Sequence, residues 1–91
     1  MRKVYLVSYD LNQPGQDYDS LIAAIRSYNG YCQALKSQWF ICSDKTAKQI
    51  CEHLVQYIDE NDWLIVCELS SNFRAWLSDE AVKWLEQVQR S

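Results

Sequence analysis

The chain has 91 residues, of which 48% are hydrophobic and 13% aromatic. This length gives room for one domain, and the composition is too apolar for an intrinsically disordered protein. Nine Lys and Arg stand against twelve Asp and Glu, so nucleic-acid binding would need a local basic edge or bound divalent ions. No apolar run is long enough to span a membrane, and the first residues do not resemble a signal peptide, so we expect a cytoplasmic protein without membrane contact.

Residues 3–11 are rich in β-branched and aromatic side chains, which predicts a strand. Both faces of this strand are largely apolar, whereas a strand with one solvated face alternates more cleanly. We therefore expect helices to cover one face and a second subunit to cover part of the other.

A loop and a helix follow this strand. Pro14-Gly15 suits the central positions of a type II turn. Apolar residues at helical spacing predict a helix over 18–29. Asp17 or Asp19 is expected to cap its start, and Gly30 to supply a positive φ at its end.

The middle of the chain predicts two strands and a second helix. The strands are expected at 31–35 and 38–42, with a tight turn at Lys36-Ser37. An apolar stripe indicates a helix over about 45–59, with Asp44 as its cap.

The last third predicts a strand over 63–69, and the residues 64–67 within it are expected to be buried on both sides. Residues 70–77 have no regular pattern. Ser78 is expected to cap a final helix that ends at about Gln89, with acidic residues favourably placed in its first turn.

The predicted order is β-α-β-β-α-β followed by a C-terminal helix. This order is typical of an α+β, ferredoxin-like domain with a four-stranded antiparallel sheet and two helices on one face. We assign residues 1–70 to this domain and residues 71–91 to a C-terminal extension, whose helix packs on the same domain or on a dimer partner.

Neither the cysteines nor the histidine forms a motif. Cys32, Cys42, Cys51 and Cys67 include no close pair of the kind that zinc sites use, so we expect reduced and mostly buried thiols. His53 lies off the apolar stripe of its helix, so a solvated surface position is favoured over a role as general base.

One family resemblance rests on the end of the first strand and the loop after it. The strand ends in Tyr9-Asp10-Leu11, the loop contains Asn12, Pro14-Gly15 and Asp17-Tyr18, and Trp39 and Asn61-Asp62 lie further along the chain. Over about residues 3–70 the chain resembles the CRISPR-associated protein 2 family, and within it the SinR-like branch. The family consists of small ferredoxin-like homodimers of CRISPR adaptation, and some members are metal-dependent nucleases.

The resemblance implies a role for Asp10. The aspartate at this position in the nuclease members is the catalytic metal ligand, and two subunits supply one carboxylate each. Asp10 is therefore the expected catalytic residue and ligand of Mg²⁺, which prefers a few carboxylates together with waters and phosphate oxygens. The alternative is that the Asp10 carboxylate accepts backbone N–H groups of the turn. Asp17 could be a second ligand, although helix capping is favoured.

Polar side chains near Asp10 are candidates for nucleic-acid binding, with solvent or the sheet as their alternative partners. They are Ser8, Asn12, Gln13 and Gln16. Lys36, Lys45 and Lys48 could converge near the hairpin as a basic edge.

The aromatic residues are expected at a homodimer interface. The candidates are Tyr9, Trp39, Trp76 and Trp84. Tyr9 and Trp39 could instead pack in the core, or stack on bases together with Phe40 and Trp63. Trp76 and Trp84 could instead dock onto their own subunit.

Two functions remain from the sequence. The first is a homodimeric, Mg²⁺-dependent endonuclease acting on RNA or DNA. The second is a catalytically inert dimer that serves as a protein or nucleic-acid adaptor in a defence, counter-defence or toxin–antitoxin system. A phosphate-binding glycine loop is absent because the chain has only two glycines, so a nucleotide-binding regulator is disfavoured.

Overall fold

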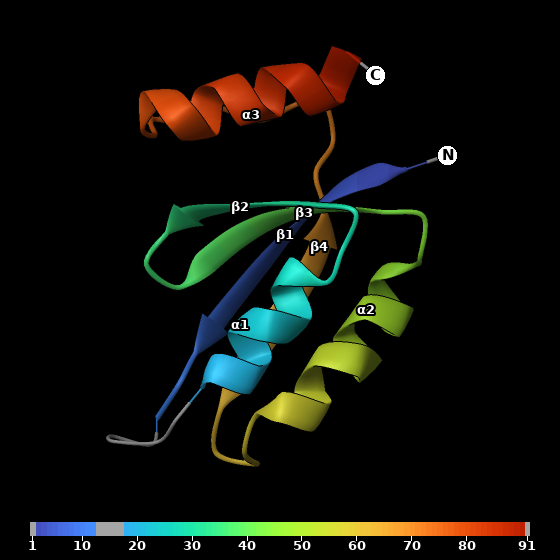
Figure 1. The fold of residues 1–91 in the computed structure, drawn as a ribbon, viewed down its shortest axis with the longest axis vertical. Helices are drawn as coiled ribbons and strands as arrows, with labels where there is room; N and C mark the ends of the chain where they lie inside the picture. Colours follow the sequence, from blue (N-terminus) through green and yellow to red (C-terminus); the bar gives the residue numbers. More distant parts are fainter. Residues whose placement is uncertain (1, 13–17, 91) are drawn as a thin grey trace.

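The computed structural model describes residues 2–12 and 18–90, and within this part the chain forms an α+β fold with three α-helices and one four-stranded antiparallel sheet (Figure 1). The elements are β1 (Lys3–Asp10), α1 (Asp19–Arg26), β2 (Gly30–Leu35), β3 (Gln38–Ser43), α2 (Ala47–Leu54), a short 3₁₀ turn (Val55–Tyr57), β4 (Trp63–Glu68) and α3 (Asp79–Arg90). The predicted elements are all present, although most are shorter than their apolar patterns indicate.

The strands lie in the order β2-β3-β1-β4, so β1 and β3 are central and β2 and β4 are the two edges. All neighbours are antiparallel, and Tyr5 of β1 lies opposite Ile41 of β3 and Glu68 of β4. Side chains of a strand alternate between the two faces, so this register decides which residues share a face.

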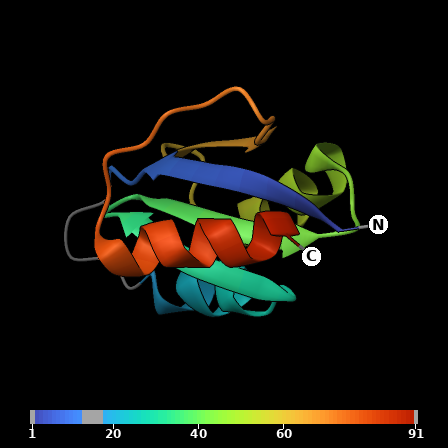
Figure 2. The same ribbon diagram turned by 90° about the horizontal axis from the view of Figure 1, so that it is seen from above.

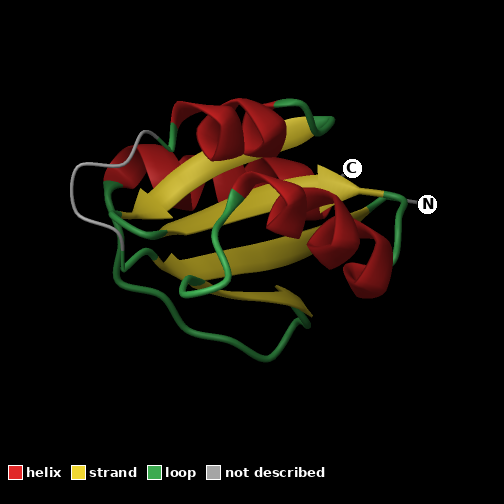
Figure 3. Cartoon of the chain, turned by 90° about the horizontal axis from the view of Figure 1, so that it is seen from below, coloured by secondary structure: helices red, strands yellow, loops and turns green. Residues whose placement is uncertain are grey.

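Helices α1 and α2 pack on one face of the sheet (Figure 3). The core between them consists of Tyr5, Val7, Tyr9, Trp39 and Ile41 from the sheet, Leu21, Ala24 and Ile25 from α1, and Ile50 and Leu54 from α2. The strand residues alternate, and the helix residues recur three or four positions apart, as burial on one side of each element requires.

Helix α3 covers part of the opposite face. It lies over β3 and β2 and leaves β1 and β4 uncovered (Figure 2). The Trp84 indole stacks on Phe40 with ring centroids 6.1 Å apart, and Ala81 and Leu85 are buried beneath the helix. A Cβ atom on Gly30 would lie 3.5 Å from Trp84, an ordinary van der Waals contact, so the indole packs over the start of β2.

The expected cap of α2 is wrong, and Asp19 is not the cap of α1. Thr46, not Asp44, caps α2, because its hydroxyl accepts from the Gln49 amide at 3.1 Å while the Gln49 side chain accepts from the Thr46 amide at 2.9 Å. This reciprocal capping box requires a residue with hydrogen-bonding groups three positions after the cap. Helix α1 begins at Asp19 without a side-chain cap.

Gly30 and Ser78 are the other two residues expected at helix ends. Gly30 is the first residue of β2 and is not a positive-φ helix terminus. Ser78 does cap α3, since its hydroxyl accepts from the Ala81 amide at 3.2 Å. Asp17 and Pro14-Gly15 lie outside the described residues.

The expected burial of β4 on both sides is also wrong. Trp63 and Ile65 are 68% and 61% exposed, and Cys67 is exposed as well. Their side chains point to the same face of the sheet as α3. Helix α3 covers β3 and β2 on this face but does not cover β4 (Figure 2). The apolar run therefore reports a strand with one buried face and one uncovered apolar face.

The two C-terminal tryptophans provide a matched test of this packing. Replacing Trp84 with Ala removes the stacking on Phe40, so we expect a loss of about 2 kcal/mol in the free energy of unfolding, less than the 3–5 kcal/mol of a fully buried tryptophan. Trp76 is 100% exposed, so Trp76→Ala should change stability by less than about 0.5 kcal/mol. Urea unfolding of both variants measures the difference, and equal losses would contradict the placement of α3.

Candidate functional site

The candidate site lies where β1 ends. Asp10 is the last residue of β1 and is opposite Trp63 of β4 in the register, on the face that α1 and α2 do not cover. Ser8 and Ile65 are the next opposite pair on the same face. A cavity of about 230 Å³ runs along these residues.

The Asp10 carboxylate has no hydrogen-bond or ion-pair partner among the described residues, and the residue is exposed. The alternative in which Asp10 accepts backbone N–H groups of the turn is therefore not observed. Its oxygens face solvent at the open end of the site, and all their lone pairs are available to a ligand.

A different aspartate orders the loop beside Asp10. The Asp62 carboxylate accepts from the Asn12 amide at 2.8 Å, from the Asp59 amide at 2.9 Å and from the Tyr18 hydroxyl at 3.0 and 3.1 Å. These donors belong to the loop after β1, the start of α1 and the turn before β4. One buried side chain thus joins three segments that are far apart in sequence.

The pKa of Asp62 follows from these contacts. Burial by itself raises the pKa, because it penalises the charged form, but the hydrogen bonds from Asn12, Asp59 and Tyr18 outweigh it. The net effect holds the pKa of Asp62 below the usual range of an aspartate. The residue is therefore charged at neutral pH and only 7% exposed.

Sequence reasoning missed the structural role of Asp62. It lies in the run Asp59-Glu60-Asn61-Asp62, which looks like a solvated break between two elements. The available indication was position, because a polar residue directly before a buried strand can turn back and accept from the preceding turn. The partners Asn12 and Tyr18 are more than 40 residues away and follow only from the tertiary fold.

The structure describes two of the four residues that are predicted to contact nucleic acid. The Ser8 hydroxyl is half-buried and accepts from the Gln38 side chain at 3.3 Å. The Asn12 side chain donates to the Asn61 carbonyl at 2.9 Å, so it supports the loop. Gln13 and Gln16 lie outside the described residues.

The four predicted interface aromatics have three different environments. Tyr9 and Trp39 are buried beneath α1, where the Trp39 indole N–H donates to the Tyr9 hydroxyl at 3.2 Å. Trp84 docks onto its own sheet. Trp76 alone has a completely exposed side chain. Trp63 and Ile65, which are not among these four candidates, are further exposed large apolar side chains.

Two further expectations are wrong. Lys36 lies in the β2–β3 turn, whereas Lys45 and Lys48 follow the other end of β3, so the three lysines do not form a basic edge. His53 is half-buried, not solvated, and its Nδ1 lies 2.8 Å from the Tyr28 hydroxyl. His53 belongs to the helix layer behind the sheet and takes no part in the site at Asp10.

No group of three or more His, Cys, Asp or Glu side chains that could hold a metal occurs in residues 2–12 and 18–90. Asp10 supplies a single free carboxylate. This donor set fits Mg²⁺ only if a second carboxylate, waters or phosphate oxygens complete the coordination.

The sequence matches no protein-family model and no curated protein. No helix in the described part of the chain is both long and apolar enough to cross a membrane.

The lowered pKa of Asp62 predicts how stability depends on pH. A carboxylate whose pKa is lower in the folded state stabilises the fold above its unfolded pKa, about 3.9 for Asp, and this contribution disappears as the pH falls through the folded value. Asp62→Asn should therefore be less stable than the wild type at pH 7, and the difference should shrink below about pH 4. Urea unfolding between pH 7 and 3 measures this.

Asp44→Asn is the matched control. Asp44 is exposed and directly follows β3, at the end of the sheet away from Asp62. Its unfolding should follow the wild type at each pH. A deficit in Asp62→Asn that is the same at pH 7 and pH 3 would contradict a charged, hydrogen-bonded Asp62.

Proposed function

We propose that the chain is a homodimeric, metal-dependent phosphodiesterase that cleaves RNA or DNA, with Asp10 from each subunit as the metal ligand. One observation carries this proposal. The Asp10 carboxylate is exposed and has no partner among the described residues, and Asp10 lies opposite Trp63 at the end of an uncovered apolar face. A polar contact of the fold would have used its oxygens, as it uses those of Asp62.

The uncovered face supports a second copy as the missing component. Trp63 and Ile65 are large apolar side chains next to each other on β4, and burial of one such side chain contributes about 1.5–3 kcal/mol. In a two-fold dimer the same patch on both subunits makes the contact. A contact centred near Trp63 brings the two Asp10 carboxylates close to each other.

Mg²⁺ is the expected cofactor. Two Asp10 carboxylates, waters and phosphate oxygens match its ligand preference. When bound, such a metal lowers the pKa of an attacking water and stabilises charge on the phosphate. The residues of this chain would hold the metal and position the phosphate, with Ser8 next to Asp10 on the same face.

The proposal extends to the family and the fold class. The strand order β2-β3-β1-β4, with α1 and α2 packed on the same face, supports a ferredoxin-like interpretation. Tyr9-Asp10-Leu11 at the end of β1 supports membership of the CRISPR-associated protein 2 family. The net charge of −3 favours metal-assisted binding of a phosphate over binding by a basic surface.

A second candidate function is the inert dimeric adaptor. Trp76 favours it, because a completely exposed tryptophan in the segment between β4 and α3 has no role within the described fold. Tryptophan is frequent among residues that dominate binding energy at interfaces. An adaptor would need Trp76 and tolerate the loss of Asp10, whereas the nuclease needs Asp10.

Replacing Asp10 tests the enzyme. Asp10→Ala should lower the rate of Mg²⁺-dependent cleavage by at least about 100-fold, because even residues that only support a metal ligand account for about 10- to 100-fold. Stability should change by less than about 0.5 kcal/mol, since no described contact is lost. The measurement is cleavage of labelled single- and double-stranded RNA and DNA with Mg²⁺, Mn²⁺ or EDTA.

Asp44→Ala controls for the removal of an exposed carboxylate and should cleave as the wild type does. Light scattering on every variant measures its oligomeric state, so that only dimeric variants are compared with the dimeric wild type. Equal cleavage by the wild type and Asp10→Ala, or no cleavage by a folded dimer, would remove Asp10 as the catalytic residue.

The dimer surface is tested by charge. Ile65→Lys places a cation in the uncovered face and should convert the dimer to a monomer, with loss of cleavage. Leu35→Lys is the matched control, because Leu35 is 51% exposed but lies at the end of β2, on the opposite edge strand. Sedimentation velocity compares the two, and a dimer that survives Ile65→Lys would place the interface elsewhere.

A further inference from the structure

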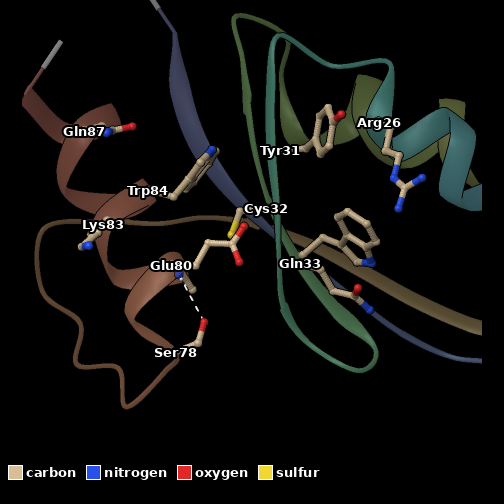
Figure 4. A pocket seen from close by; sticks show the side chains of 11 residues that line it. Arg26, Tyr31, Cys32, Gln33, Ser78, Glu80, Lys83, Trp84 and Gln87 are labelled. Atoms are coloured by element: carbon tan, nitrogen blue, oxygen red, sulfur yellow. Dashed lines mark hydrogen bonds between the residues drawn. The ribbon is translucent and has the colours of Figure 1, made fainter.

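A slot runs along the outer edge of β2, on the side of the sheet away from Asp10 and β4. It has a volume of about 590 Å³ and lies between the end of α1 and the exposed side of α3 (Figure 4). Tyr31, Gln33 and Arg26 line one wall, and Glu80, Lys83 and Trp84 line the other. The edge strand β2 contacts α1 on one face of the sheet and α3 on the other, so both helix layers border the slot.

The floor of the slot is unpaired main chain. The Tyr9 amide donates to the Ser37 carbonyl, so alternate residues of β1 from Tyr5 to Tyr9 point toward β3. The register of β1 with β3 and of β3 with β2 extends this alternation to β2. The main-chain groups of Gly30 and Cys32 therefore pair with β3, and those of Tyr31 and Gln33 point away from the sheet at its edge.

Two amides and two carbonyls are thus directed into the slot, because each of these residues carries one donor and one acceptor. No backbone hydrogen bond to them is present within the described chain.

The stretch of this edge from Gly30 to Gln33 carries no lysine, proline or bulge that would block strand addition. Natural edges are often blocked by Lys, by Pro or by a bulge. The sequence of β2 from Gly30 to Leu35 contains neither Lys nor Pro, and its register shift begins only after Gln33. The stretch from Gly30 to Gln33 is therefore regular and open.

The charges of the slot favour an acidic ligand. The Arg26 guanidinium lies 5.6 Å from the centre of the Trp39 ring, and no carboxylate of the described residues pairs with it. The ion pairs in the described residues are Lys3–Glu68 and Lys48–Glu52, so Lys83 is also without a carboxylate partner. Glu80 is the one acidic residue of the lining, and it lies on the α3 wall.

We propose that this slot binds an extended peptide segment of a partner protein as a fifth strand alongside β2. Its main chain pairs with Tyr31 and Gln33. Its side chains alternate, so acidic ones face Arg26 on the α1 wall and apolar ones face Trp84 on the α3 wall. The regular stretch of this edge runs only from Gly30 to Gln33, so the main-chain groups that it offers match one short extended segment. The proposal does not depend on the nuclease activity.

A synthetic peptide tests the proposal with the full chain. The probe is acetyl-Thr-Val-Glu-Val-Glu-Val-Thr-amide, titrated to millimolar concentration into ¹⁵N-labelled protein. We expect the largest amide shifts at residues 31–33, and slower hydrogen exchange at the Tyr31 and Gln33 amides. The same peptide with N-methyl groups on alternate residues, where they face β2, should not bind.

Charge exchange tests the assigned wall. Arg26→Glu should weaken binding of the acidic peptide by about two- to fivefold, the range of an exposed ion pair. The variant should prefer a peptide with Lys in place of both Glu residues, which excludes simple misfolding as the cause. Arg74→Glu, an exposed charge change in the segment before α3, should leave both affinities unchanged.

Several outcomes would overturn the proposal. One is the absence of amide shifts at millimolar peptide, and another is equal binding of the N-methylated peptide. Shifts centred on Trp63 and Ile65 would place the peptide on the other half of the sheet. Shifts at residues 31–33 with a single-stranded oligonucleotide, but not with the peptide, would assign the slot to nucleic acid.

Discussion

The central strand β1 is apolar on both faces, and most of the structure follows from the need to cover it. Tyr5, Val7 and Tyr9 are fully enclosed by α1 and α2. On the other face, the only helix in the described chain is α3, and it packs over β3 and β2 through Trp84 and Leu85. One helix is too narrow for a four-stranded sheet, so Trp63 and Ile65 remain in solvent. The exposed surface is therefore a direct consequence of how much helix the chain has, and the proposed dimer and the proposed site at Asp10 both depend on it.

Two aspartates near the same loop differ in burial and in the use of their carboxylate oxygens. Asp62 is buried and uses its oxygens on Asn12, Asp59 and Tyr18, which holds the loop after β1 against the turn before β4. Asp10 is exposed and uses none. The first makes the position of the second well defined, because the loop that follows Asp10 is tied down at its second residue, Asn12. An available carboxylate at a fixed position is what a metal ligand requires.

The element order and most strand positions could be predicted because they depend on local patterns. The β-branched and aromatic residues in 3–11 and the helical spacing in residues 45–59 each indicate the correct element. Errors occur where the deciding contact is distant. Trp39 and Tyr9 looked suitable for an interface, but α1 covers them. Ile65 and Cys67 looked buried on both sides, but α3 does not reach them. Asp62 looked solvated, although its partners Asn12 and Tyr18 lie at the other end of the chain. A pattern shows that a side chain is apolar or charged, but it does not show what lies opposite.

The sequence by itself determined the α+β class, the four strands, the three helices and the position of Asp10 at the end of the first strand, since each depends on neighbours a few residues away. Only the tertiary structure decided which apolar face stays open, which carboxylate is left without partners, and that a slot of unpaired main chain runs beside β2. These properties depend on the strand order and on the path of α3 across the sheet. Both are set by contacts between segments far apart in the chain, such as Trp84 on Phe40, which no local periodicity encodes.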